Sequence, residues 1–387
     1  MGAFGAYQNE IYQGGLEEVR PELPTDLTRL ESLAEQRMPG EAFGYVAGSA
    51  GSEATARANR AAFERWRIVP RMLRDVSTTD LSTTVLGTAM PAPVALAPIG
   101  VLGIVHPDGE SAVARAAGSF GLPMVVSTAA STSLEEIAVA GGDAPRWFQL
   151  YWPKDPDLAL SFLQRAAAAG YQALVLTVDT YTMGWRPRDL DNAFLPFLRA
   201  VGNQNYFSDP VFQGLVGGPI GEDNRLAAIL HWAATFGNPS LTWDDLGFLR
   251  DNWRGPIALK GILHPDDARR AADAGMDGVI VSNHGGRQVD GAVAALDALP
   301  AIAEAVGDRL ELLFDSGVRT GADVVKALAL GARTVLLGRP YAYGLGLGGE
   351  AGVRHVLRCV LAELELTLAL SGVTRPAELG RELLVAA

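Results

Sequence analysis

The stretch PIALKGILHPDDARRAADAGMDGVIVSNH, residues 256–284, contains the repeating unit that decides the fold. Two short apolar runs, at 256–261 and 278–284, flank a segment with helical periodicity. The HPDD sequence puts proline and acidic residues at the start of that helix, where the helix dipole favours negative charge. A strand, a helix and a second strand in this order are typical of a β/α unit in a parallel sheet.

The same unit recurs along most of the chain. Short apolar runs lie at 93–98, 122–127, 146–151, 173–179, 256–261, 278–284, 311–317 and 334–340. Eight parallel strands are the number that closes a barrel. An open doubly wound sheet would carry a G-x-G-x-x-G turn after its first strand, and the sequence APIGVLG lacks that spacing. We therefore predict an α/β protein with a (β/α)8, or TIM, barrel.

The remaining segments are predicted to elaborate this one domain, residues 1–387. Residues 1–90, with helical stretches at 25–37 and 43–47 and the segment 66–73, are interpreted as a helical cover on a barrel of residues 91–350. The connection 180–241 is too long for an ordinary loop, and its aromatic residues favour an active-site lid. A helical segment, 351–387, follows the barrel. His106 and His264, each followed by Pro-Asp, are interpreted as helix-capping residues rather than ligands.

The composition restricts the class of function. A formal charge of -12 argues against a non-specific nucleic-acid surface, which needs clustered Lys and Arg, so any anionic ligand must be bound by a few local cations. The single cysteine, Cys359, lies in an apolar periodic stretch, where a buried structural thiol is expected. The sequence shows no signal-like segment and no apolar stretch of membrane length, and no metal site is predicted. We expect a cytoplasmic protein without membrane contacts.

Polar residues gather at the carboxyl ends of the predicted strands, where barrel enzymes place their active sites. These candidates are Gly100, Ser127, Gln149, Tyr151, Thr177, Asp179, Lys260, His284, Arg287, Asp315, Gly338 and Arg339. Any one of them has a structural explanation, and for an isolated Ser or Thr at a strand end that explanation is favoured. Their concentration at one end of the barrel points to a site.

Lys260 ends a buried apolar run. Burying a lysine there costs free energy of folding, unless its charge is paired with an acid or it has a catalytic role. It could form a Schiff base with a carbonyl substrate. It could also hold positive charge beside a cofactor that becomes anionic. The structural alternative is a lysine paired with a neighbouring acid.

His284 lies in SNHGGRQ, between a predicted strand and two glycines. A histidine has the pKa to take a proton near neutrality. Arg287, three residues on, offers the planar fork that binds a carboxylate. Asp179, at the end of another strand, is the best candidate for the acid that orients the imidazole. The alternative for His284 is a hydrogen-bonded core histidine.

The last two predicted strands end in DSGVRTG and LGRP, each with glycine and arginine ahead of a helix. Barrels commonly hold phosphate at this place, where helix N-termini supply further donors. The residues predict a phosphorylated ligand. FMN and a phosphosugar fit this prediction equally well.

The ordered set APIG, HPDGE, FQLYW, LTVDT, GWRPRD, LKG, SNHGGRQ, DSGVR and GRP resembles the FMN-dependent L-2-hydroxy-acid oxidase and dehydrogenase family over nearly the whole chain. Within that family it is most similar to the lactate 2-monooxygenase branch. The resemblance implies FMN as the cofactor, a small 2-hydroxy acid and O2 as substrates, and a homotetramer or octamer.

Carried over position by position, the resemblance also implies roles. His284 would be the base with Asp179 bonded to it, and Lys260 would stabilise the anionic reduced flavin. The substrate would be bound by Tyr45, Tyr151, Arg186 and Arg287. The cofactor would contact Pro98, Ile99, Gly100, Ser127, Gln149, Thr177, Lys260, Asp315, Gly317, Arg319, Gly338 and Arg339.

Two positions depart from the plain oxidase pattern. Gly100 stands where many members have alanine, and its missing methyl is expected to open space beside the flavin. Ala129 stands where glycolate-type oxidases have a bulky aromatic, which implies a roomier pocket that Met183 and the lid could refill.

The function predicted from this resemblance is conversion of L-lactate and O2 to acetate, CO2 and water, with the lid retaining the intermediates. The nearest alternative is an oxidase that releases keto acid and hydrogen peroxide. A quinone-linked dehydrogenase is disfavoured, because the long loop has no membrane-binding apolar segment. A Schiff-base lyase using Lys260 and a non-catalytic flavin protein are the remaining alternatives.

Overall fold

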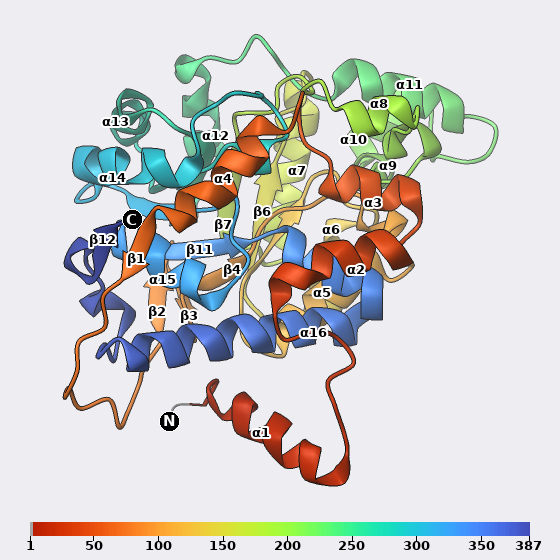
Figure 1. Cartoon of the computed structure of the whole chain (residues 1–387). Coiled ribbons are helices and arrows are strands. Elements are labelled where there is room, and N and C mark those ends of the chain that lie inside the picture. Colours follow the sequence, from red (N-terminus) through yellow and green to blue (C-terminus); the bar gives the residue numbers. More distant parts are fainter. Residues whose placement is uncertain (1–2) are drawn as a thin grey trace.

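The computed structural model describes residues 3–387 and contains a closed barrel of eight parallel strands (Figure 1). The strands are β4 (Val94–Leu96), β5 (Met124–Ser127), β6 (Arg146–Leu150), β7 (Ala173–Thr177), β8 (Ile257–Ile262), β9 (Gly278–Val281), β10 (Glu311–Phe314) and β11 (Thr334–Leu337). They pair in chain order, and β11 closes the ring on β4. Each strand falls within one of the eight predicted runs or extends it by one residue, so the predicted barrel is confirmed.

Helices connect the strands and surround the barrel (Figure 1). They are α5 (Gly109–Gly118), α6 (Leu134–Gly141), α7 (Pro156–Ala168), α12 (Leu246–Asn252), α13 (Pro265–Asp273), α14 (Ala295–Val306), α15 (Gly321–Ala329) and α16 (Arg339–Leu370). Local side chains begin several of them: Ser133 forms a capping box on α6, and His264 Nδ1 accepts the N–H of Asp266 at 3.1 Å. His106 Nδ1 likewise accepts the N–H of Asp108, just before α5, at 3.1 Å. The capping interpretation is confirmed for His264, the N-cap residue of α13. His106 instead accepts from Asp108, which is itself the N-cap residue of α5, so it does not cap that helix.

The barrel interior is packed from the amino ends of its strands. A hairpin of β2 (Thr83–Val85) and β3 (Thr88–Met90) places Val85, Leu86 and Met90 in one buried cluster with inward-facing strand residues such as Trp147. The Trp147 indole donates to Thr88 Oγ1 at 2.9 Å, which satisfies the one polar atom of that ring. With this end filled by side chains, space for a ligand is left at the carboxyl ends.

The predicted N-terminal cover is helical. It comprises α1 (Ala6–Gly14), η1 (Gly15–Glu17), η2 (Leu27–Arg29), α2 (Leu30–Arg37), α3 (Gly40–Ala47) and α4 (Ala54–Glu64). Helix α1 has no buried residue and stands apart from the barrel in Figure 1. β1 (Trp66–Ile68) pairs antiparallel with β12 (Leu384–Ala386), a pairing of the two ends of the chain that the sequence did not suggest.

The C-terminal segment continues from the barrel without a separate core. Helix α16 starts directly after β11, departs from helical geometry at Gly348 and Gly349, and buries Cys359 as expected. The short helices η7 (Pro376–Glu378) and η8 (Arg381–Leu383) follow. No helix among residues 3–387 is both long enough and apolar enough to cross a membrane.

The long connection after β7 is folded rather than loose. It contains α8 (Pro187–Asp191), η4 (Pro196–Arg199), α9 (Gln204–Phe207), α10 (Pro210–Leu215) and α11 (Arg225–Thr235), and η5 (Trp243–Asp245) follows it. Its aromatic residues pack on one another: Phe197 stacks on Trp232 with ring centroids 4.6 Å apart, and Trp232 lies 4.8 Å from Phe236. We call residues 180–241 the insert.

A buried carboxylate joins the loops after the first two barrel strands. Glu110, in α5, is fully buried, and its Oε1 accepts the N–H of Leu102 at 3.0 Å and of Ser131 at 2.9 Å. Burial raises the pKa of this carboxyl, although the hydrogen bonds from the two loops oppose the shift. Leu102 belongs to the turn η3 (Leu102–Ile104), and Ser131 follows β5.

We expect Glu110→Ala to lower the free energy of unfolding by about 2–5 kcal/mol, because two buried N–H groups would each lose their acceptor. Urea unfolding followed by tryptophan fluorescence measures this. Glu378→Ala is the matched control, because Glu378 is exposed and accepts only local bonds from Thr374. Glu378→Ala should lower the free energy of unfolding by no more than about 0.5 kcal/mol. Equal losses of unfolding free energy in the two variants would show that Glu110 does not stabilise the fold by joining these two loops.

Candidate active site

A pocket of about 1090 Å³ opens at the carboxyl ends of the barrel strands. Most of the predicted site residues line it: Tyr45, Pro98, Ile99, Gly100, Ser127, Tyr151, Arg186, Lys260, His284, Arg287, Asp315, Gly317, Arg319, Gly338 and Arg339. Asp179 and Gln149 stand behind this lining and contact members of it. Thr177 instead lines a neighbouring cavity, which shares Tyr151 and Thr180 with the pocket.

His284 follows β9 in a tight turn that aims its ring across the barrel. Its φ of 58° lies in the left-handed region, and Ser282 Oγ accepts its N–H at 3.0 Å. Nδ1 lies 2.9 Å from Asp179 Oδ1 and 3.0 Å from Thr180 Oγ1. Burial lowers the pKa of His284, and the Asp179 carboxylate partly offsets this. In the neutral imidazole, Nδ1 is occupied by these contacts with Asp179 and Thr180. Nε2 is therefore the nitrogen that can accept a proton as a base.

Asp179 meets His284 because β8 makes room for it. The register of β8 shifts between Lys260 and Ile262, and Gly261 in between has a φ of 110°. A Cβ at Gly261 would lie 2.6 Å from the Cβ of Asp179, so only glycine fits. Burial alone would raise the pKa of Asp179. At the acidic pH where this carboxyl titrates, however, the imidazole of His284 is protonated, and its charge and that of Lys260 outweigh burial and bring the pKa to about 2. The carboxylate therefore stays ionised.

Lys260 is both paired and in the pocket wall. Its Nζ lies 3.2 Å from Asp315 Oδ2 and donates to Ser282 Oγ at 3.0 Å. Burial opposes its charge, but Asp315 and Asp179 prevail and raise the pKa of the ammonium. A lysine held protonated has no lone pair for a Schiff base, so this geometry favours the role of a fixed positive charge.

Arg186 and Arg287 place two further cations at the mouth of the pocket. Arg287 donates to the carbonyls of Tyr45 and Gly48 and lies 5.1 Å from the centroid of the Tyr45 ring. Burial and the nearby Arg186 lower the pKa of Arg287 to about 9. Within the described residues neither arginine forms an ion pair with a carboxylate. The pair is suited to an anion that the protein itself does not supply.

The two arginines at the ends of the last strands differ in their contacts. Arg319 is partly buried, lies 3.6 Å from Glu31 and donates to the carbonyl of Val318 at 3.1 Å. Burial lowers the pKa of Arg319. The donors that these contacts leave unused can bind an anion. Arg339 instead donates to the carbonyls of Val46, Gly48 and Gly285 and to Ser49. It lines the pocket, but most of its donors tie the N-terminal cover to the His284 turn.

Gln149 in β6 has a side-chain amide nitrogen without a partner, beside the end of β5. Ser127 Oγ donates to Gln149 Oε1 at 2.9 Å, while Gln149 Nε2 is buried and has no hydrogen-bond partner. A buried N–H donor without a partner costs free energy that a ligand carbonyl would recover.

The expectation for Gly100 was wrong in one respect. A Cβ there would lie 2.6 Å from the carbonyl oxygen and 2.9 Å from the Cβ of Ala129. The missing methyl therefore lets the loops after β4 and β5 approach each other, rather than leaving free space beside a ligand. Gly100 and Ala129 form one closely packed pair in the pocket wall.

Sequence reasoning missed several residues that position the site. Ser316, with a φ of 86°, donates to Asp315 Oδ1 at 2.8 Å and accepts the N–H of Gly285 at 3.0 Å. Ser282, Thr180 and Gly261 likewise contact the predicted residues. The available signal was their place next to Asp315, His284, Asp179 and Lys260 in the motifs.

A closed barrel with a histidine–carboxylate pair, a buried ammonium and two arginines that have no carboxylate partner defines an enzyme that acts on an anionic substrate beside an anionic cofactor. The family model for FMN-dependent dehydrogenases matches residues 34–386. The chain belongs to this family, and it is an FMN-dependent 2-hydroxy-acid oxidoreductase.

Individual relatives support the same family. An FMN-dependent alpha-hydroxy acid dehydrogenase of Schizosaccharomyces pombe is 49% identical, with 98% of this chain and 96% of the relative covered. An L-lactate oxidase of Lysinibacillus sphaericus is 43% identical, covering 91% and 90%. A structure of mandelate oxidase with (S)-4-hydroxymandelic acid is 40% identical with a TM-score of 0.83, covering 94% of this chain and 99% of that one.

The residues present fit FMN. The unpartnered Gln149 amide and Ser127 offer hydrogen bonds for a polar ring edge, and Lys260 offers positive charge. Gly317, whose φ of 91° and contact with Asn59 exclude a Cβ, leaves backbone exposed next to Arg319, as a phosphate site requires.

We expect Asp179→Asn to lower the pKa of His284 further, because the carboxylate opposes the effect of burial on the imidazole. Titration of the histidine ring signals by NMR, assigned with a His284→Gln variant, measures this. The exposed His264 is an internal control whose ring chemical shifts should be the same in the two proteins at each pH. An unchanged or raised pKa of His284 would show that Asp179 does not stabilise the imidazolium.

Proposed function

We propose that this enzyme oxidises L-lactate with O2 and releases acetate, CO2 and water, as a lactate 2-monooxygenase. The observation that carries the oxidation step is the neutral His284, bonded to an ionised Asp179, in the same pocket as two unpaired arginines. The relatives named L-lactate oxidase support lactate as the substrate.

The substrate carboxylate is assigned to Arg186 and Arg287, with the Tyr45 hydroxyl beside them. This places C2 of the substrate toward His284, whose Nε2 takes a proton while Asp179 stabilises the imidazolium that results. FMN, when bound, accepts the two electrons of the oxidation. Lys260, held protonated by Asp315, supplies positive charge where the cofactor gains negative charge.

The roof of the pocket supports retention of the first products. Met183, Phe197 and Phe236 of the insert line the pocket opposite the barrel. Phe236 also packs on Tyr151 with ring centroids 5.2 Å apart. An apolar roof excludes water and slows the escape of small polar molecules. Pyruvate and hydrogen peroxide held together there react to acetate, CO2 and water, and this reaction balances without a further reactant.

The second candidate is a lactate oxidase that releases pyruvate and hydrogen peroxide. The same base, arginines and cofactor residues serve both reactions. The observation that favours the oxidase is that relatives more than 40% identical carry that name. The two activities differ in whether the products stay under the insert long enough to react.

The stoichiometry of products in air separates these candidates. The holoenzyme is given L-lactate with catalase omitted, and acetate, pyruvate and hydrogen peroxide are quantified per lactate consumed. We expect acetate to match lactate, with little free peroxide. Equal amounts of pyruvate and peroxide would replace the monooxygenase with the oxidase, and no reduction of the bound flavin by lactate would rule out lactate as the substrate.

We expect His284→Ala to retain FMN but to lose substrate-dependent flavin reduction by about 10²- to 10⁴-fold, the range of general base catalysis. Stopped-flow absorbance under anaerobic conditions measures the rate of reduction. His264→Ala, which removes an exposed capping histidine, is the matched control and should reduce at the wild-type rate. Normal reduction in His284→Ala would remove His284 from the role of base.

A further inference from the structure

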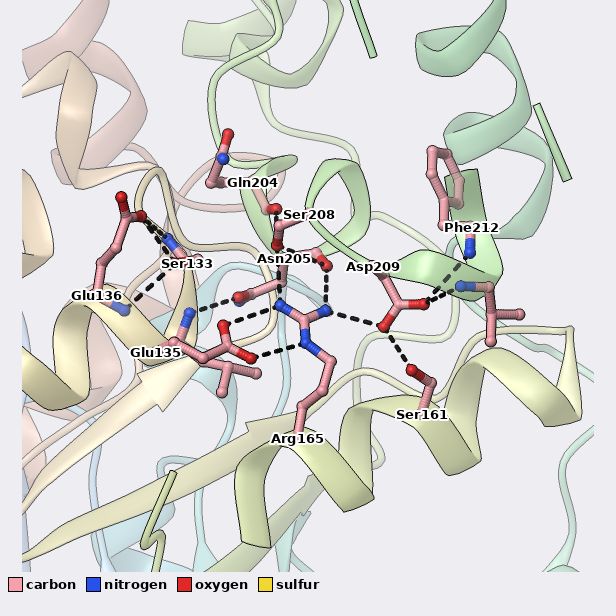
Figure 2. A network of polar contacts seen from close by, with 12 residues as sticks. Ser133, Glu135, Glu136, Ser161, Arg165, Gln204, Asn205, Ser208, Asp209 and Phe212 are labelled. Atoms are coloured by element: carbon pink, nitrogen blue, oxygen red, sulfur yellow. Dashed lines mark hydrogen bonds and ion pairs between the residues drawn. The ribbon is translucent and has the colours of Figure 1, made fainter. Parts of the chain in front are cut away.

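The middle of the insert is fastened to the outside of the barrel by one arginine (Figure 2). Arg165, in α7, contacts both carboxylate oxygens of Glu135 in α6, at 2.8 and 3.0 Å. It also donates to Asp209 Oδ2 at 2.8 Å, to the Asn205 carbonyl at 2.7 Å and to Ser208 Oγ at 2.8 Å. A guanidinium has five N–H donors, and here all five are used.

Asp209, the insert carboxylate in this network, is as buried as a core residue. The Asp209 side chain has no exposed surface, accepts from Ser161 Oγ at 2.7 Å, and accepts the N–H groups of Val211 and Phe212 at the start of α10. Breaking one partner of a buried charge pair leaves the other charge uncompensated. Residues 203–212 are thus docked on α6 and α7, and they do not behave as a free lid.

Asn205, next to these contacts, reaches from the insert to the end of β5. Its side chain is fully buried. Its Nδ2 donates to the carbonyls of Ser127 at 3.2 Å and Thr128 at 3.1 Å, and its Oδ1 accepts the N–H of Leu134 at 2.8 Å. One side chain thereby fixes two consecutive carbonyls in the loop that follows the strand.

Ser127 at the end of β5 and Thr128 after it are bonded to two further residues assigned to the flavin and the substrate, Gln149 in β6 and Tyr151 just after it. Ser127 Oγ donates to the Gln149 amide oxygen, and Thr128 Oγ1 donates to the Gln149 carbonyl at 2.5 Å. The N–H of Tyr151 in turn donates to Thr128 Oγ1 at 3.0 Å. A displacement of Ser127 and Thr128 therefore moves Gln149 and Tyr151 with them.

We propose that Asn205 is a positioning residue for the cofactor wall, through which the docked insert sets Ser127, Gln149 and Tyr151. This inference rests on the assignment of that wall to FMN. It implies that FMN affinity depends on a residue in the insert that does not line the pocket. It also explains why a polar side chain is fully buried in a segment otherwise rich in aromatics.

The test compares Asn205→Ala with Asn224→Ala. Asn224 lies in the same insert and also links backbone groups, accepting from Gly221 and donating to Pro219, but in the described part of the chain neither of these partners lines the pocket or is hydrogen-bonded to β5 or β6. FMN is added back to apoenzyme, and its dissociation constant and bound absorption spectrum are recorded beside the thermal unfolding midpoint. We expect Asn205→Ala to weaken FMN binding by about tenfold or more and to shift the flavin spectrum, because two carbonyls lose their donor. Asn224→Ala should leave both unchanged.

Asn205→Asp covers the case in which Asn205→Ala does not fold. It keeps the size of the side chain and the bond from Leu134, and it loses the two N–H donors. Weakened FMN binding with an altered spectrum supports the proposal. A lowered unfolding midpoint with wild-type FMN affinity and spectrum overturns it, since that result reflects a structural role alone. These readouts do not need turnover, so failure of the enzyme to oxidise lactate would refute the proposed function separately.

Discussion

The rest of the structure depends on one constraint: the parallel sheet closes into a barrel whose interior is packed at the amino ends of its strands. The β2–β3 hairpin and the inward-facing strand residues fill the barrel at the amino ends of the strands. Polar side chains inside a barrel would otherwise need buried partners. They are concentrated instead at the carboxyl ends, where Lys260, Asp315 and His284 meet around one opening. Residues distant in sequence become neighbours because their strands end at the same rim.

The rim of the barrel has more positive side chains than carboxylates close enough to pair with them. Asp179 and Asp315 are committed to His284 and Lys260. In the part of the chain that the structure describes, Arg186 and Arg287 have no carboxylate within ion-pair distance, and Arg319 has only that of Glu31, 3.6 Å away. The chain as a whole has a net charge of -12, so this positive pocket contrasts with its surroundings and focuses the field on anionic ligands. A phosphorylated cofactor and a carboxylate substrate both satisfy charges that the protein leaves open.

The strands and most of the site could be predicted from sequence because they depend on local patterns. Apolar runs followed by polar residues identify strand ends, and the motif containing His284 and Arg287 is contiguous. Contacts between distant segments were less accessible. His284 and Asp179 are 105 positions apart, and their 2.9 Å contact was predicted from their places at strand ends and from the family resemblance, not from any local pattern. The mistaken view of Gly100 has the same cause, because the atom that excludes a side chain there belongs to Ala129 on the next loop. The carbonyl partners of Arg339 also come from segments that no motif connects.

The insert shows how one connection can serve two purposes. Its middle, residues 203–212, is held by buried charges and by a fully buried asparagine, so moving it would expose Asp209 and leave Arg165 with only its polar contacts to Glu135. Its flanks carry Met183 and Phe236, which line the pocket, and Met183 is 49% exposed. Segments with few buried contacts open at the least cost in free energy. Any opening that admits substrate therefore has its lowest cost in the flanks, while the docked middle holds the wall that we assign to the cofactor.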